Sequence, residues 1–266
     1  MYKQILDWWK SKNIETDAEL AEALNGHAIA FAYNSGKIEN PDITYNDTRE
    51  IFENDRLSGY TGNLRTIFEL RNAKDANEHF LKAFGQKDPI SADLILRIQY
   101  ELTKNTYDTR RWEIGERPGE YKKHDYVTGQ EEVGALPDET PEEIRELIDE
   151  MADIDEKNAL IAAAYFHVKF ENIHPFADGN GRTGRMAMNY ILVTHNHPPI
   201  IIHEEDRKAY YAALESWDVK QELGPMLEFL KDQAEKTWRP YLEREDRDSD
   251  EKTSLSDYLD LEEDAR

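Results

Sequence analysis

Residues 174–185, His-Pro-Phe-Ala-Asp-Gly-Asn-Gly-Arg-Thr-Gly-Arg, combine residue types that do chemistry rather than fill a core. His174 titrates near neutrality and is a candidate general base. Asp178 offers carboxylate oxygens of the kind that Mg²⁺ takes alongside substrate phosphates. Arg182 and Arg185 lie three residues apart, so on a helix they point near one face, and their planar guanidinium groups suit phosphate oxygens. The segment therefore predicts a polyphosphate site with a base beside it.

The flanking periodicity places this segment in a loop that ends at a helix N-terminus. Apolar residues recur at helical spacing over 155–172 before it and over 183–194 after it. A helix N-terminus has unpaired N–H groups and a positive partial charge, so it binds anions. Gly179 and Gly181 permit positive φ and let the backbone approach a ligand closely, which favours a nest of amides around a phosphate.

The segment resembles the signature of the Fic-domain family, His-Pro-Phe-x-Asp-Gly-Asn-Gly-Arg-x-x-Arg, at every fixed position. The resemblance covers roughly 35–217. It implies a mainly α fold: a Fic-type helical domain with a β-hairpin flap and an N-terminal inhibitory helix. The implied activity is protein adenylyltransfer, in which AMP moves from ATP to a Ser, Thr or Tyr hydroxyl of a target protein or of this chain itself.

The resemblance also implies a role for each motif residue. His174 deprotonates the target hydroxyl, Asp178 holds Mg²⁺ against the α- and β-phosphates, and Arg185 reaches the γ-phosphate. Tyr210 and Tyr211 correspond to a pair that often lines the adenine pocket, although core packing would explain them equally well. The implied nucleotide-binding residues of the motif are Gly179, Asn180, Gly181, Arg182, Thr183, Gly184 and Arg185.

Ser35-Gly-Lys-Ile-Glu39-Asn40 looks like the inhibitory motif of Fic proteins. Ser35 and Glu39 are four residues apart and share one helix face. The resemblance implies that Glu39 pairs with Arg185 and takes the arginine that the γ-phosphate of ATP needs. Without the signature downstream, Glu39 would read as an ordinary solvated glutamate near a helix end.

Over 110–138 the helical period fails, and 121–127 and 130–135 are predicted to pair as two short strands. The resemblance implies a flap that holds the target backbone by strand addition. A surface hairpin without a docking role is the alternative. The predicted target-docking tip consists of Val127, Thr128, Gly129 and Gln130.

We predict three parts of the chain. They are an N-terminal helical region with the inhibitory motif, 1–90; the Fic core, 91–242; and an acidic, mobile tail, 243–266. Helices are expected at 17–39, 47–54, 63–84, from 91, and at 141–151, 155–172, 183–194, 206–217 and 223–242.

The composition excludes some classes of partner. The net charge is −23, whereas nucleic acids and anionic membranes need a basic face. The chain has no cysteine and no apolar run long enough to span a membrane, so a cytoplasmic protein is expected. The expected partners are ATP and a hydroxyl-bearing protein. Whether the chain forms a homo-oligomer is left undecided by the sequence.

Alternatives within the same fold are transfer of another nucleotide, a phosphate or phosphocholine, and removal of AMP with Glu39 positioning a water. A non-catalytic regulator that only holds ATP is a third class. The presence of His174 argues against that class, because a pure binder needs no base there. The sequence does not identify the target, the modified residue or the signal that releases the inhibition.

Overall fold

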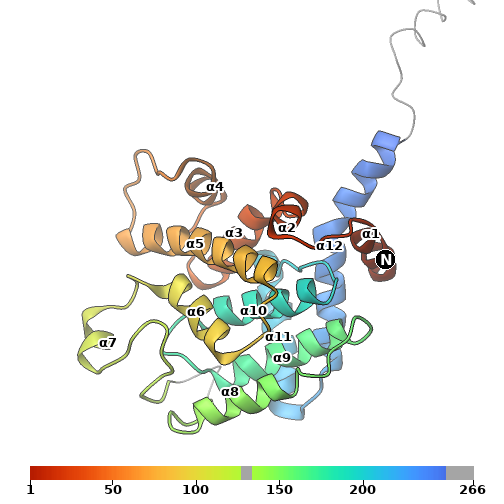
Figure 1. The fold of residues 1–266 in the computed structure, drawn as a ribbon. Coiled ribbons are helices and arrows are strands. Elements are labelled where there is room, and N and C mark those ends of the chain that lie inside the picture. Colours follow the sequence, from red (N-terminus) through yellow and green to blue (C-terminus); the bar gives the residue numbers. More distant parts are fainter. Residues whose placement is uncertain (127–133, 250–266) are drawn as a thin grey trace, which may run out of the picture.

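The computed structural model describes residues 1–126 and 134–249, and the side chains up to 245. The described residues form helices and contain no strand (Figure 1). In chain order the helices are α1 Tyr2–Ser11, α2 Asp17–Ala23, α3 His27–Glu39, α4 Tyr45–Asn54, α5 Leu64–Gln86, α6 Ala92–Thr103, α7 Thr109–Glu113, α8 Thr140–Asp149, α9 Ala159–Ile173, α10 Asn180–Thr194, the 3₁₀ turn η1 Glu204–Asp206, α11 Arg207–Lys220 and α12 Gly224–Ser249.

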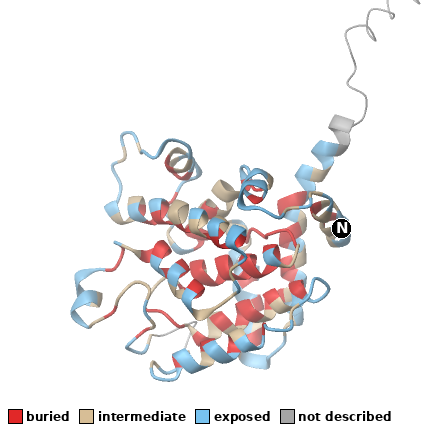
Figure 2. Ribbon diagram, in the orientation of Figure 1, coloured by how far each residue is buried: buried red, intermediate tan, exposed pale blue. Residues whose placement is uncertain are grey.

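Helices α9 and α10 form the centre of the molecule. Figure 2 shows buried residues concentrated along these two helices. Phe166 and Phe170 of α9 and Met188 and Ile191 of α10 are all fully buried in one hydrophobic cluster. Burying a side chain of this size stabilises a fold by about 1.5–3 kcal/mol, so the pair is a firm base for the loop that joins it. That loop is the first part of the motif segment.

The N-terminal region differs from the single helix that we predicted over 17–39. Thr16 caps α2 in a capping box with Glu19, and the helix ends at Ala23. Gly26 has φ +79°, a left-handed conformation that a continuous helix does not allow, and α3 starts at the next residue. The prediction of one helix was therefore wrong, because the apolar spacing continues across the break. Helix α3 packs against α5 and α10.

The periodicity missed the short helix α7, Thr109–Glu113, which reaches into the described part of 110–138. Asp108 caps α7 by accepting from the N–H of Arg111. The predicted flap tip, Val127, Thr128, Gly129 and Gln130, lies outside the described residues. On the described sides of it, the N–H of Lys122 donates to the Pro175 carbonyl and the N–H of Ala135 donates to the Ile173 carbonyl.

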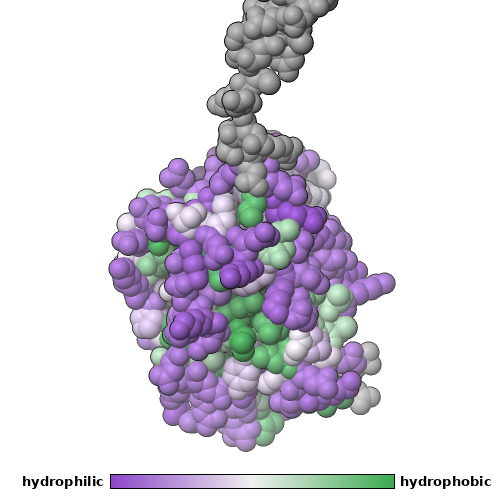
Figure 3. Space-filling view, turned by 90° about the vertical axis from the view of Figure 1, so that its right-hand side faces the viewer, coloured by the Kyte–Doolittle hydropathy of each residue, from purple (hydrophilic) through white to green (hydrophobic). Residues whose placement is uncertain are grey.

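Helix α12 is longer than predicted and continues to Ser249, into the segment that we expected to be a tail. Its extension is held by Glu245, whose carboxylate accepts from Trp8 Nε1 at 2.6 Å and from Lys12 Nζ at 3.0 Å. Figure 3 shows a largely hydrophilic surface with an apolar area in the middle of the face drawn. The hydrophilic surface agrees with the acidic composition.

In residues 1–126 and 134–249, none of the helices combines the length and the apolar character that crossing a membrane requires.

Candidate active site

The motif loop is held closed by its own asparagine. Asn180 is 3% exposed; its Oδ1 accepts from the Phe176 N–H at 2.9 Å and its Nδ2 donates to the Phe176 carbonyl at 2.8 Å. Gly179, with φ +85°, is the N-cap residue of α10, which therefore begins three residues earlier than predicted. A side chain at this φ is strained, and a Cβ there would also meet the Thr103 methyl at 2.6 Å. The backbone at the start of α10 is thus fixed in an anion-binding geometry.

Thr183 and Gly184 lie farther inside the protein than the rest of the nest. The Thr183 side chain is fully buried, and its N–H already donates to the Gly179 carbonyl at 2.9 Å. Gly184 lies against α9, where a Cβ would meet Glu171 Oε1 at 2.5 Å and Phe170 Cδ1 at 2.9 Å. Glycine at this position lets the two central helices approach closely. The N-terminal N–H groups before Thr183 remain the ones available to a ligand.

His174 ends α9 in a left-handed conformation, with φ +51°. Its backbone N–H donates to the Phe170 carbonyl at 3.0 Å, which fixes the backbone where the motif loop begins. Burial, followed by the nearby charge of Lys122, lowers the pKa of His174 to about 4. The imidazole is therefore unprotonated at neutral pH and can accept a proton.

Asp178 is surrounded by three guanidinium groups from three different helices. Its Oδ2 lies 2.7 Å from Arg65 Nη2 of α5 and 3.9 Å from Arg111 Nη2 of α7, and its Oδ1 lies 3.1 Å from Arg182 Nη2 of α10. Burial on its own would raise the pKa of Asp178, but the three positive charges outweigh it and lower the pKa. Asp178 is therefore a carboxylate. Gln99 Nε2 donates to its backbone carbonyl at 2.9 Å.

Arg185 and the two predicted inhibitory residues meet inside the protein. Arg185 Nε donates to Ser35 Oγ at 3.0 Å, and its Nη2 donates to the Ser35 carbonyl at 3.0 Å and to Glu39 Oε1 at 2.9 Å. Arg185 is 1% exposed, whereas 39% of the Glu39 side chain is exposed. Residues 146 and 150 positions apart in the sequence are thus brought together, and α3 engages the Nε and Nη2 groups of Arg185.

The two tyrosines of α11 occupy different environments. Tyr210 is 1% exposed, and its hydroxyl lies 2.8 Å from His167 Nε2. The Arg185 guanidinium carbon lies 5.9 Å from the Tyr210 ring. Tyr211 is 47% exposed, so of the two it is the one open to a ligand. Their role at the adenine stays a prediction.

Several site residues were missed by the sequence reasoning. Arg65 and Arg111 belong to segments that we interpreted as core helix and loop, and an isolated arginine there carries no signal. Glu171 is different, because it lies four residues after His167 on an apolar helix. Burial raises its pKa to about 8 despite Arg185, so it is protonated at neutral pH. A carboxyl on the apolar side of a buried helix was a signal that the sequence did contain.

Residues 89–192 match the model of the Fic/DOC family. "Protein adenylyltransferase Fic" of Drosophila erecta is 28% identical over 238 residues, 86% of this chain and 44% of that protein. The same-named protein of Drosophila persimilis is 44% identical over 80 residues, 30% of this chain and 16% of that protein. The chain thus spans less than half the length of these curated relatives.

Two solved structures share the fold. A Fic-domain-containing signaling protein from Bacteroides thetaiotaomicron superposes with a TM-score of 0.73 at 24% identity, covering 89% of this chain and 93% of that one. Fic-1 from C. elegans, residues 134–508, superposes with a TM-score of 0.75 at 22% identity, covering 93% of this chain and 72% of that one. These likenesses show the helical fold, and the family match lies over the motif itself. Over residues 89–192 the chain therefore resembles the Fic/DOC family.

Proposed function

We propose that this chain is a protein adenylyltransferase that moves AMP from ATP to a Ser, Thr or Tyr hydroxyl of a protein. The observation that carries the proposal is an unprotonated histidine, His174, beside the open N-terminus of α10 in a Fic domain. A base next to an anion nest suits attack of an alcohol on a phosphate. The printed names of the curated relatives support the same reaction.

The reaction is an in-line displacement. His174 takes the proton of the target hydroxyl while its oxygen forms a bond to the α-phosphorus of ATP. The bond from the α-phosphorus to the oxygen that bridges to the β-phosphorus breaks, and its electron pair leaves with pyrophosphate. General-base catalysis of this kind contributes about 10²–10⁴-fold. The N–H groups at the start of α10 and Arg182 bind the phosphates and stabilise their negative charge.

Asp178 is the residue we propose to hold Mg²⁺. Among the residues that the structure describes, no three His, Cys, Asp or Glu side chains form a metal cluster. A single carboxylate fits the way in which Mg²⁺ binds nucleotides, because phosphates and waters supply its other ligands. When bound, the ion neutralises phosphate charge. Asp178 must then give up part of its contact with the arginines around it.

We further propose that Glu39 inhibits the enzyme within the same chain. Its ion pair with Arg185, together with the Ser35 contacts, satisfies the guanidinium group that would bind the γ-phosphate. An arginine engaged in this way binds phosphate only after Glu39 is displaced, so ATP is held in a less productive position. Release of Glu39 is therefore the step that activates the enzyme.

The test is the intact mass of the Glu39→Gly protein after incubation with ATP and Mg²⁺. We expect an increase equal to one or more adenylyl groups, and no increase in the Glu39→Gly/His174→Ala double variant. A mass increase equal to a phosphate would overturn the assignment of the transferred group. An adenylyl increase that persists without His174 would overturn the assignment of the base.

A further inference from the structure

We propose that Arg65 and Arg111, two residues outside the motif, join Arg182 to form a binding site for the pyrophosphate leaving group. The inference rests on the proposed function and adds two substrate-binding residues to it. The motif accounts for one arginine beside Asp178. The structure adds one from α5 and one from α7, which are separated by 46 positions in the sequence.

The three guanidinium groups converge on one carboxylate. Arg65 and Arg111 both approach Oδ2 of Asp178, and Arg182 approaches Oδ1. A carboxylate can accept several hydrogen bonds. When Asp178 coordinates a metal ion instead, the three guanidinium groups lose this acceptor. The β- and γ-phosphate oxygens of a nucleotide whose metal is held by Asp178 are then the nearest anions. Planar guanidinium groups match such oxygens.

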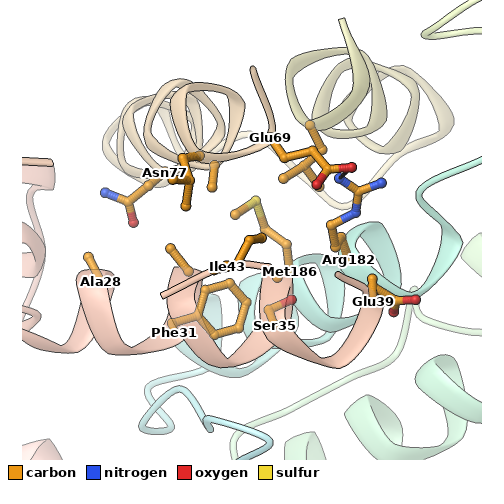
Figure 4. Close-up of a pocket in the computed structure, with 14 residues that line it drawn as sticks. Ala28, Phe31, Ser35, Glu39, Ile43, Glu69, Asn77, Arg182 and Met186 are labelled. Atoms are coloured by element: carbon orange, nitrogen blue, oxygen red, sulfur yellow. Dashed lines mark ion pairs between the residues drawn. The ribbon is translucent and has the colours of Figure 1, made fainter. Parts of the chain in front are cut away.

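Unpaired donors at this place also point to a missing ligand. Arg182 is 8% exposed, yet within residues 1–126 and 134–245 its Nε has no hydrogen-bond partner, and neither has the buried Nε of Arg111. Buried donors of charged groups are rarely left unpaired, because the desolvation cost is large. Figure 4 shows Arg182 and Glu69 turned toward each other at one end of the hollow between α3 and α5, where the Arg182 Nη1 to Glu69 Oε1 distance is 3.9 Å. Glu69 is thus too far away for a full hydrogen bond with Arg182.

The cluster is less negative than the chain as a whole. Three arginines face three carboxylates, Asp178, Glu69 and Asp108, so the cluster is neutral in a chain whose total is −23. A bound Mg²⁺ would add two positive charges. Pyrophosphate carries several negative charges and can span arginines on three helices, whereas AMP carries only the phosphate that stays with the product. The site therefore selects for the leaving group and stabilises the charge that develops on it as the bond to the α-phosphorus breaks.

The inference is tested by calorimetric titration of inorganic pyrophosphate with Mg²⁺ into Glu39→Gly protein, in which Arg185 lacks its ion pair with Glu39. Arg65→Gln and Arg111→Gln are each expected to weaken pyrophosphate binding at least tenfold, about 1.4 kcal/mol. Affinity for AMP, titrated in parallel, is expected to change less than threefold. Arg49→Gln is the matched control, because Arg49 lies on α4 and its ion pair among the described residues is with Glu53 on the same helix. The pyrophosphate affinity of this variant is expected to stay the same.

Two outcomes overturn the inference: pyrophosphate affinity that is unchanged in both arginine variants, or equal losses for AMP and pyrophosphate, which would indicate a purely structural role. If Arg65→Gln does not fold, Arg65→Lys keeps the charge without the planar fork and is expected to bind pyrophosphate several-fold more weakly. The titration measures pyrophosphate binding and does not require adenylyl transfer, so failure of the proposed function is detected separately, by the intact mass. If the protein acquires adenylyl groups but its pyrophosphate affinity is unchanged in Arg65→Gln and Arg111→Gln, only this inference is refuted.

Discussion

Replacing Glu39 by glycine removes one charged hydrogen bond from Arg185. The bond is 2.9 Å long and joins an arginine that is 1% exposed to a glutamate whose side chain is 39% exposed. A hydrogen bond between charged groups contributes about 1.5–3 kcal/mol. Solvent at Glu39 screens the interaction, which places it near the lower end of that range. The two Ser35 contacts at 3.0 Å stay in place and keep the guanidinium group oriented.

The loss of about 1.5 kcal/mol shifts the population of Arg185 that is free to bind phosphate by roughly tenfold, since 1.4 kcal/mol is one factor of ten. We therefore expect the initial rate of auto-adenylylation to rise by about tenfold in Glu39→Gly, and at most by about a hundredfold if the pair is worth the full 3 kcal/mol. The effect is expected at subsaturating ATP, where occupancy of a productive position limits the rate.

The assay is incorporation of label from α-labelled ATP with Mg²⁺, followed by denaturing electrophoresis at several times. Glu53→Gly is the matched control, because Glu53 lies in the last turn of α4 and, in the part of the chain that the structure describes, its ion pair is with Arg49 on the same helix. It is expected to label at the wild-type rate. Equal rates for wild type and Glu39→Gly would refute the inhibitory reasoning, and a similar rise in Glu53→Gly would attribute the effect to loosened structure instead.

Three further predictions concern single residues. Arg185→Ala in the Glu39→Gly background is expected to lower labelling at least tenfold, and an unchanged rate would show that the γ-phosphate contact is misassigned. The transfer rate of Glu39→Gly is expected to be flat between pH 6 and 8, because the pKa of His174 is about 4 and the imidazole is already neutral there; an inflection near about 6.5, the ordinary histidine pKa, would contradict this. His27 is 3% exposed, and burial lowers its pKa to about 3, so the unfolded chain binds this proton first as the pH falls below about 6.5. When the pH is lowered from 7.5 to 5.5, protonation of His27 in the unfolded chain is expected to lower the free energy of unfolding, measured in urea, by about 1.4 kcal/mol. The free energy of unfolding of His27→Gln is expected to fall by less over the same range. An equal fall in the two proteins would contradict the assignment to His27.

The helices that carry the motif could be predicted because their pattern is local. The apolar spacing of α9 depends on residues a few positions apart. The break between α2 and α3 was missed because apolar spacing continues across Gly26, whose left-handed φ interrupts the helix. The end of α12 was missed because contacts from α1, far away in the sequence, support a segment that by itself reads as charged and unstructured.

By itself, the sequence predicted the Fic signature, a candidate base, a candidate metal-binding carboxylate and an anion nest at the start of α10, because these residues lie within one continuous segment. The resemblance also named Glu39 and Arg185 as partners. Only the tertiary structure placed Arg65 and Arg111 around Asp178, lowered the pKa of His174 by burial and raised that of Glu171. The physical reason is that burial and charge proximity depend on which helices pack together, and no short-range pattern records that packing.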